Sequence, residues 1–213
     1  MVAIGDPTSM LERFVANWVY GASLFALFLL ALAPLLLHGF PPAVAAVFFT
    51  LPAYMLHQWE EHDNDRFRLF VNHWIGNDRQ ALSRLDVFLI NVPGVWGVIT
   101  LSLWLAATIN SGYGYVAIYL VLVNAVVHIL QAILMRRYNP GTITAVILFL
   151  PVGGYAWFLL NRADASVVYN SLGLAIAIAI HLAIMLRVRL NLTARLTSQS
   201  IESAVPDRNR EPL

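Results

Sequence analysis

Residues 113–135, YGYVAIYLVLVNAVVHILQAILM, decide the fold of this chain. The stretch has no charged residue and is long enough to cross a hydrocarbon layer of ~30 Å, which needs roughly 20 residues of helix. Asn124 and His128 are unusual in such a helix, and their spacing of four places both side chains on one face. Polar residues in a membrane span usually face the protein interior. The stretch therefore predicts a transmembrane helix with a polar face directed into the protein.

Five further apolar stretches of comparable length flank this one. They lie near residues 18–37, 42–61, 86–109, 142–160 and 166–186. The 213 residues are 59% hydrophobic and 12% charged, with a mean hydropathy of +0.69, whereas soluble domains are about 45–50% apolar and about 25% charged. We therefore expect an all-α fold, a polytopic membrane bundle of about six transmembrane helices.

The remaining segments divide the chain into three parts. Segment 62–85 alternates apolar with basic and polar residues, which predicts an interfacial helix between the second and third spans. Residues 1–16 are predicted to form a cytoplasmic amphipathic lead-in, and residues 17–190 the six-helix membrane domain. Residues 191–213 are predicted to be a polar, disordered cytoplasmic tail.

Arginine placement predicts the topology. All thirteen basic residues are arginines. Cytoplasmic loops of membrane proteins carry an excess of positive charge. With six spans and a cytoplasmic N-terminus, twelve arginines lie on the cytoplasmic side and only Arg162 lies on the other. We expect both termini in the cytoplasm.

Composition also excludes several kinds of chemistry. The chain has no cysteine, which rules out disulfides, thiolate catalysis and iron–sulfur clusters bound by cysteine. It has no lysine, which rules out Schiff-base catalysis and a Walker-type phosphate loop. The formal net charge of +1 gives no reason to expect a nucleic-acid partner.

The few polar residues within the spans share one level. An ionisable side chain at the centre of a span costs ~2.5–3.5 kcal/mol on insertion scales. At ~1.5 Å per residue, each of these residues except Asn124 lies within roughly 12 Å of the cytoplasmic end of its helix, and Asn124 lies one turn deeper than His128. They come from five helices and are His57, Glu60, Glu61, Asp86, Asn91, Asn124, His128, Thr142, Thr144 and His181. We expect one polar cluster in the inner half of the bundle.

The residue types in this cluster are typical of a metal site or an acid–base site. Glu60 and Glu61 follow His57 by three and four positions, so all three project from one helix face. Helical bundles build metal sites from such residues together with a histidine of a facing helix. The predicted ligands of a zinc, iron or manganese ion are His57, Glu60, Glu61, His128 and His181. The predicted catalytic residues, with or without metal, are Glu60, Glu61, His128 and Asn124.

Simpler interpretations stay open for these residues. The two glutamates can be solvated at a helix end, and Asn124 with His128 can join helices through hydrogen bonds. A purely structural role suits His181 equally well. Three further histidines fall in turns or in the interfacial segment, where we expect contact with water: His38, His62 and His73.

Three motifs stand in order along the chain: HQWEE at residues 57–61, NAVVH at 124–128 and YNPGTIT at 138–144. The chain resembles the HXXEE family of bacterial membrane proteins, whose pattern is HxxEE, NAxxH and YxPGxxT and whose function is uncharacterised. The resemblance, with the arginine placement, implies the bacterial inner (plasma) membrane. Asn-Pro-Gly is a turn sequence, which predicts a tight link between the fourth and fifth spans. From this third motif the predicted supporting residues are Tyr138, Pro140, Gly141 and Thr144.

Three functions are compatible with the sequence. The first is a metal- or Glu/His-dependent enzyme, similar to a hydrolase, that acts on a lipid or lipid-anchored substrate, because the site is buried among spans. The second is a proton- or ion-coupled transporter, which the one-sided site and the lack of an internal repeat disfavour. The third is a structural membrane protein whose polar cluster locks the bundle. Membrane lipids are the expected partners.

Overall fold

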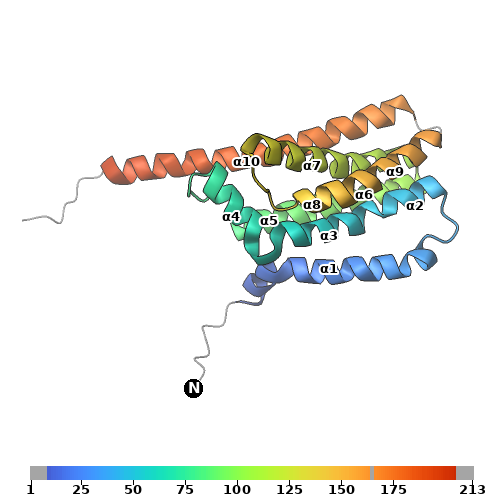
Figure 1. Ribbon diagram of the computed structural model, residues 1–213, viewed down its shortest axis with the longest axis horizontal. Coiled ribbons are helices and arrows are strands. Elements are labelled where there is room, and N and C mark those ends of the chain that lie inside the picture. The colour runs from blue at the N-terminus through green and yellow to red at the C-terminus, as the bar shows by residue number, and fades with distance from the viewer. Residues whose placement is uncertain (1–8, 164–165, 205–213) are drawn as a thin grey trace, which may run out of the picture.

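The computed structural model describes residues 9–163 and 166–204, with side chains up to residue 194. The described residues form helices and connecting turns without a strand, which confirms the all-α fold. Six helical segments run back and forth side by side (Figure 1). Five of them are long and apolar enough to cross a membrane: Met10–Leu36, Arg84–Thr108, Ser111–Met135, Thr142–Arg162 and Val167–Ala194.

Several of these segments consist of successive helical elements. The first is α1 (Met10–Leu36) and the last is α10 (Val167–Ala204). The third contains α5 (Arg84–Leu89), η3 (Ile90–Trp96) and α6 (Gly97–Thr108), and the fourth contains η4 (Ser111–Tyr113) and α7 (Gly114–Met135). The fifth contains α8 (Thr142–Thr144), η5 (Ala145–Phe149) and α9 (Leu150–Arg162).

The second predicted span is a pair of shorter helices, α2 (Pro42–Phe48) and α3 (Thr50–His62), that follow each other end to end (Figure 1). Pro52 explains the interruption, because a proline has no N–H to donate to the carbonyl of Phe48. At the break, the Phe49 N–H donates at 3.2 Å to the carbonyl of Ala46, three residues earlier, whereas a regular α-helix bonds to the carbonyl four residues earlier. The exact count of six spans is therefore approximate, since α2 and α3 cover the length of one span only together.

The helix predicted between the second and third spans is present. After α3 the chain forms η1 (Asp63–Asp65), α4 (Arg66–Phe70) and η2 (Val71–Ile75). Asn64 and Asp65 turn the chain with positive φ values of 52° and 65°. The Asn72 side chain accepts the N–H groups of Ala81 and Leu82, both at 2.9 Å, and so closes the following turn.

One end of the bundle collects the arginine-bearing segments. The start of α1, the segment from η1 to the start of α5, and the loop after α7 all lie at the end from which α10 projects (Figure 1). Arg162 closes α9 at the opposite end. The arrangement matches the predicted separation of arginines, and the assignment of this end to the cytoplasm remains a prediction.

The domain boundaries differ from expectation at the C-terminal side. α10 continues through residue 204 and therefore covers part of the predicted tail 191–213. Polarity alone does not end a helix, and the first proline or glycine after residue 190 is Pro206. Asn191 also holds α10 to the bundle, because its Nδ2 donates to the carbonyl of Ala81 at 2.9 Å. Residues 205–213, and residues 1–8 of the predicted lead-in, lie outside the described residues.

The core of the bundle is built around α7. Its residues Tyr115, Ile118, Leu120 and Val121 are fully buried among the other helices. α7 packs against α6, α9 and α10, and its C-terminal half lies beside α3 and η5. This packing brings His128 of α7 to the C-terminal end of α3.

Candidate functional site

The centre of the site is the buried carboxylate of Glu61, near the end of α3. Three imidazoles surround it. Its Oε2 lies 3.6 Å from Nε2 of His57 and 3.1 Å from Nε2 of His62, and its Oε1 lies 3.4 Å from Nε2 of His128. All four residues are buried, with His57 at 0% exposure and Glu61 at 5%. The site is therefore a buried cluster of one carboxylate and three histidines.

Hydrogen bonds fix the orientation of His57. The Thr144 hydroxyl donates to Oε2 of Glu60 at 2.5 Å, so its oxygen can accept the N–H of His57 Nδ1, which lies 2.8 Å away. With the proton on Nδ1, Nε2 carries a lone pair and faces Glu61. This Nε2 has no hydrogen-bond partner among the described residues, and neither has Nδ1 of His128. Buried nitrogens without a partner are rare, so these two nitrogens are candidates for binding a ligand.

The spacing of these groups suits a metal ion. His57, Glu61 and His128 each offer one ligand atom, and these atoms all lie within 4.8 Å of one another. Ligands about 2.1 Å from a tetrahedral ion lie roughly 3.4 Å apart. His57 Nε2 lies 3.6 Å from Oε2 of Glu61 and His128 Nε2 lies 3.4 Å from Oε1, and both separations are close to that value. The group could therefore hold a divalent ion with at least one coordination position left open.

Glu60, although next in sequence, has a different environment. Its carboxylate accepts the backbone N–H of Ile143 at 3.1 Å and of Thr144 at 2.7 Å. These are unpaired N–H groups at the start of the fifth helical segment, so Glu60 caps that helix from α3. The Tyr138 hydroxyl donates to the same carboxylate at 2.6 Å. Burial and the nearby Glu60 raise the pKa of Tyr138 to about 12, which keeps this proton in place.

The turn between α7 and α8 covers the site. Gly141 has a φ of +99°, and a Cβ atom at this position would lie 2.7 Å from Cε1 of His128 and 2.8 Å from Cε1 of His57. Only glycine supplies both the backbone conformation and the space. Asn139 is fully buried beneath the turn, and its Nδ2 donates to Oε1 of Gln131 at 2.5 Å. The predicted Asn-Pro-Gly turn thus packs directly on two of the histidines.

The three sequence motifs therefore meet at a single place. A family model described as "Protein of unknown function with HXXEE motif" matches residues 46–156. The chain belongs to the HXXEE family. No match was found among curated proteins or among solved structures. The HXXEE match extends from α2 into α9 and includes every site residue named so far.

Asn124 and His181, which were predicted to belong to the site, lie at its edge. Asn124 is one helical turn from His128, and its Nδ2 donates to the hydroxyl of Tyr54. Tyr54 in turn packs against the His57 ring, with 5.9 Å between ring centroids. His181 is half-buried on α10, and its Nδ1 lies 2.8 Å from the carbonyl of Ala177, one turn earlier in the same helix. The structure thus places Asn124 behind His57 and engages His181 with its own backbone.

The sequence analysis missed His62. We expected this residue to contact water, but it is only 6% exposed, and its ring lies 5.4 Å from that of Trp18. Its Nε2 is also 3.3 Å from Nδ2 of Asn91, whose Oδ1 accepts a hydrogen bond from Gln58 at 2.8 Å. Two features of the sequence could have indicated that His62 is buried. It directly follows Glu61, and the third span contains a polar residue, Asn91, that had no predicted partner.

Proposed function

We propose that this HXXEE protein is a membrane-embedded, metal-dependent hydrolase in which His57, Glu61 and His128 bind a divalent ion. The observation that carries the proposal is the Nε2 of His57. This nitrogen is buried, lacks a hydrogen-bond partner among the described residues and lies 3.6 Å from Glu61, and donation of the Nδ1 proton to Thr144 would leave it with a free lone pair. A histidine that ligates a metal typically donates its other N–H to an oxygen in this way.

The arrangement supports the chemistry of hydrolysis. His57, Glu61 and His128 would hold a zinc, iron or manganese ion, which would supply a water with its pKa lowered to ~7 for hydrolysis. Three protein ligands are the number that catalytic metal sites commonly use, and they would leave a coordination position for that water. Without an ion, Glu61 can act as the general base towards water and a histidine can stabilise the oxyanion that forms.

Lipids or lipid-anchored molecules are the proposed substrates. The site lies between membrane-spanning segments and close to their ends, because His62 is the last residue of α3 and the Gly141 turn precedes α8. A substrate that reaches this depth from the bilayer already lies within the lipid layer. We place the site at the cytoplasmic leaflet of the inner membrane, on the arginine distribution described above.

The transporter alternative receives less support. A second polar group lies towards the opposite end of the bundle, where the Tyr119 hydroxyl donates to Oδ1 of Asn170. Between this group and the site at Glu61, α7 contributes three fully buried apolar residues, Leu120, Val121 and Ala125, and one polar residue, Asn124, which is engaged by Tyr54. The site of a transporter usually lies near the membrane midplane with access from both sides. The one-sided location fits an enzyme better.

Elemental analysis of the purified protein in detergent tests the proposal. We expect about one divalent transition-metal ion per chain, as in other sites with three protein ligands, and its loss in His128→Ala. His38→Ala is the matched control, because His38 is exposed in the turn after α1, at the end of the bundle opposite the site. A parent protein without metal, even after reconstitution with zinc, iron and manganese, would rule out the metal-dependent mechanism. Lipid esters incubated with the metal-loaded protein and analysed by mass spectrometry then test hydrolysis.

Thr144→Val is expected to weaken metal binding by about 10–100-fold, as is typical when the partner of a ligating histidine is removed. Valine keeps the shape of threonine but cannot accept the His57 Nδ1–H. Thr144→Ser keeps the hydroxyl and should restore most of the affinity, measured by competition with a chelator. A purely structural role for Thr144 would instead lower the unfolding temperature of the metal-free protein without changing the affinity for metal.

A further inference from the structure

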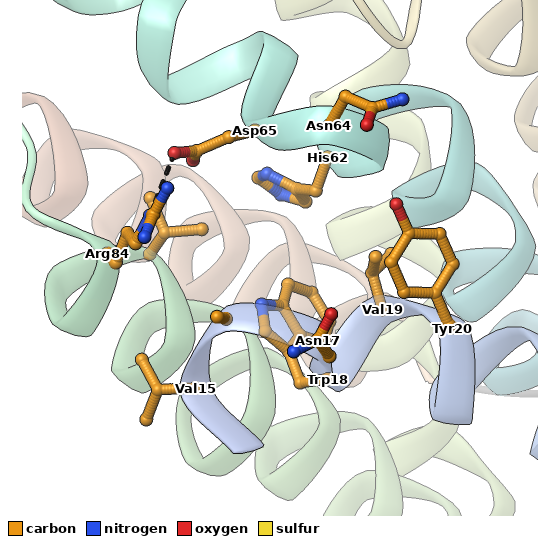
Figure 2. Close-up of a pocket in the computed structure, with 11 residues that line it drawn as sticks. Val15, Asn17, Trp18, Val19, Tyr20, His62, Asn64, Asp65 and Arg84 are labelled. Atoms are coloured by element: carbon orange, nitrogen blue, oxygen red, sulfur yellow. Dashed lines mark hydrogen bonds and ion pairs between the residues drawn. The ribbon is translucent and has the colours of Figure 1, made fainter. Parts of the chain in front are cut away.

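A cleft of about 310 Å³ lies beside the His–Glu site, between the first half of α1, the turn after α3 and the start of α5 (Figure 2). Its volume is at the lower end of the range of small-molecule sites. Its apolar lining includes Trp18, Val19 and Val87, which are buried. Its polar lining includes Tyr20 and Arg84, which are exposed. The cleft thus combines an apolar wall with a polar rim.

His62 connects the cleft to the site. It lines the cleft (Figure 2), and its Nε2 also lies 3.1 Å from Oε2 of Glu61. Its ring packs against Trp18, which also lines the cleft. A molecule in the cleft would therefore be separated from the Glu61 carboxylate by the imidazole of His62.

A cluster of charged residues adjoins the cleft, and two of its members, Asp65 and Arg84, line it. Asp65 accepts hydrogen bonds from Arg68 at 2.6–2.9 Å and from Nε of Arg84 at 3.1 Å. Burial raises the pKa of Asp65, but the two arginines outweigh this effect and lower it overall, so its charge persists. The neighbouring Asp63 is paired with Arg66 at 3.4 Å. Arg66, Arg68 and Arg84 thus outnumber Asp63 and Asp65 by one in this adjoining cluster, and Arg84 is the only one of these arginines that lines the cleft.

Arg84 is the arginine that a ligand can reach. Its ion pair with Asp65 uses Nε, and its side chain is 62% exposed (Figure 2). Arg84 also begins the third membrane-spanning segment, so it lies where the hydrocarbon layer meets the head groups. Beside the cleft, the adjacent residues Phe14 of α1 and Leu85 of α5 are more than half exposed and offer apolar surface.

We propose that this cleft binds the phosphate-bearing head group of a membrane lipid, with Arg84 contacting the phosphate and the acyl chains lying along α1 and α5. Arginine is well suited to phosphate, because its planar guanidinium group offers several donors in a fixed geometry. As a binding site the cleft stands independently of the metal. That the bound lipid is the substrate rests on the proposed function.

Titration of the full-length protein in detergent with a short-chain phosphatidic acid, followed by calorimetry, tests this proposal. Arg84→Gln should weaken binding at least tenfold. Ala16→Trp should do the same, because Ala16 lines the cleft and a larger side chain would fill it without a change in charge. The matched control is Arg189→Gln, since Arg189 is exposed on α10 outside the cleft and should bind the lipid like the parent.

The ligand series separates the possible sources of the phosphate. The diacylglycerol with the same chains lacks the phosphate and should bind at least tenfold more weakly. Inorganic phosphate should neither bind nor compete at equal concentration. Equal binding of phosphatidic acid to the parent and both cleft variants, or tight binding of inorganic phosphate alone, would overturn the proposal. The metal content of the same samples judges the metal site separately, because neither cleft variant alters His57, Glu61 or His128.

Discussion

Glu61→Gln is expected to weaken metal binding by more than about 100-fold, beyond the effect typical of residues that only support a ligand. Glutamine keeps the size of glutamate, but it removes the single negative charge that faces three imidazoles at 3.1–3.6 Å. The metal-free protein should remain folded, because glutamine keeps the shape of glutamate and its side-chain amide can still form hydrogen bonds with the neighbouring imidazoles. Zinc titration against a chelator, together with thermal unfolding of the metal-free protein, measures both effects.

The adjacent glutamate is the matched control for this experiment. Glu60→Gln removes the charged cap at the start of the fifth helical segment, which should lower stability by about 0.5–2 kcal/mol, as for other caps. The metal content should stay near that of the parent, because the Glu60 carboxylate points to Ile143 and Thr144 rather than to Glu61. Equal loss of metal in both variants would show that the two glutamates act as one unit and would contradict the division of roles.

These different roles mark a limit of sequence analysis. Both glutamates follow His57 at helical spacing, so both were predicted to be ligands and catalytic residues. Adjacent residues point about 100° apart around a helix with 3.6 residues per turn. One such step directs Glu60 to the start of α8 and Glu61 to His128. Which glutamate faces which helix depends on the packing of α3, and the sequence pattern does not determine that packing.

The burial of His62 could also not be predicted from the sequence. The segment that begins at this residue is polar, and this polarity correctly predicted a helix outside the spans. His62 itself is covered by Trp18 of α1, forty-four positions earlier in the chain. Apolar length predicted the helical segments well, because the bilayer requires about 20 residues for each. The break at Phe49 depends on a single proline inside a stretch that remains apolar throughout.

Gly141→Ala is expected to have the largest effect of any single methyl group added to the site. The backbone conformation at φ +99° costs an alanine roughly 1–2 kcal/mol. The new Cβ would also lie 2.7 and 2.8 Å from the rings of His128 and His57, closer than such contacts occur. The rings or the turn must shift, so metal binding should fall by more than about 100-fold, because ligands need positions accurate to a few tenths of an ångström. Chelator competition and thermal unfolding measure the two losses.

Gly39→Ala separates the clash from the backbone effect. Gly39 has a similar φ of +84°, but a Cβ atom there would meet nothing within 4 Å. This variant should therefore lose roughly the same 1–2 kcal/mol from the backbone and keep the full affinity for metal. The difference between the two variants then reports the contact between Gly141 and the histidines. The contrary outcome is that Gly141→Ala binds metal as tightly as Gly39→Ala. That outcome would show that the turn does not pack tightly on the metal-binding histidines. The YxPGxxT motif would then serve only to join the fourth and fifth helical segments.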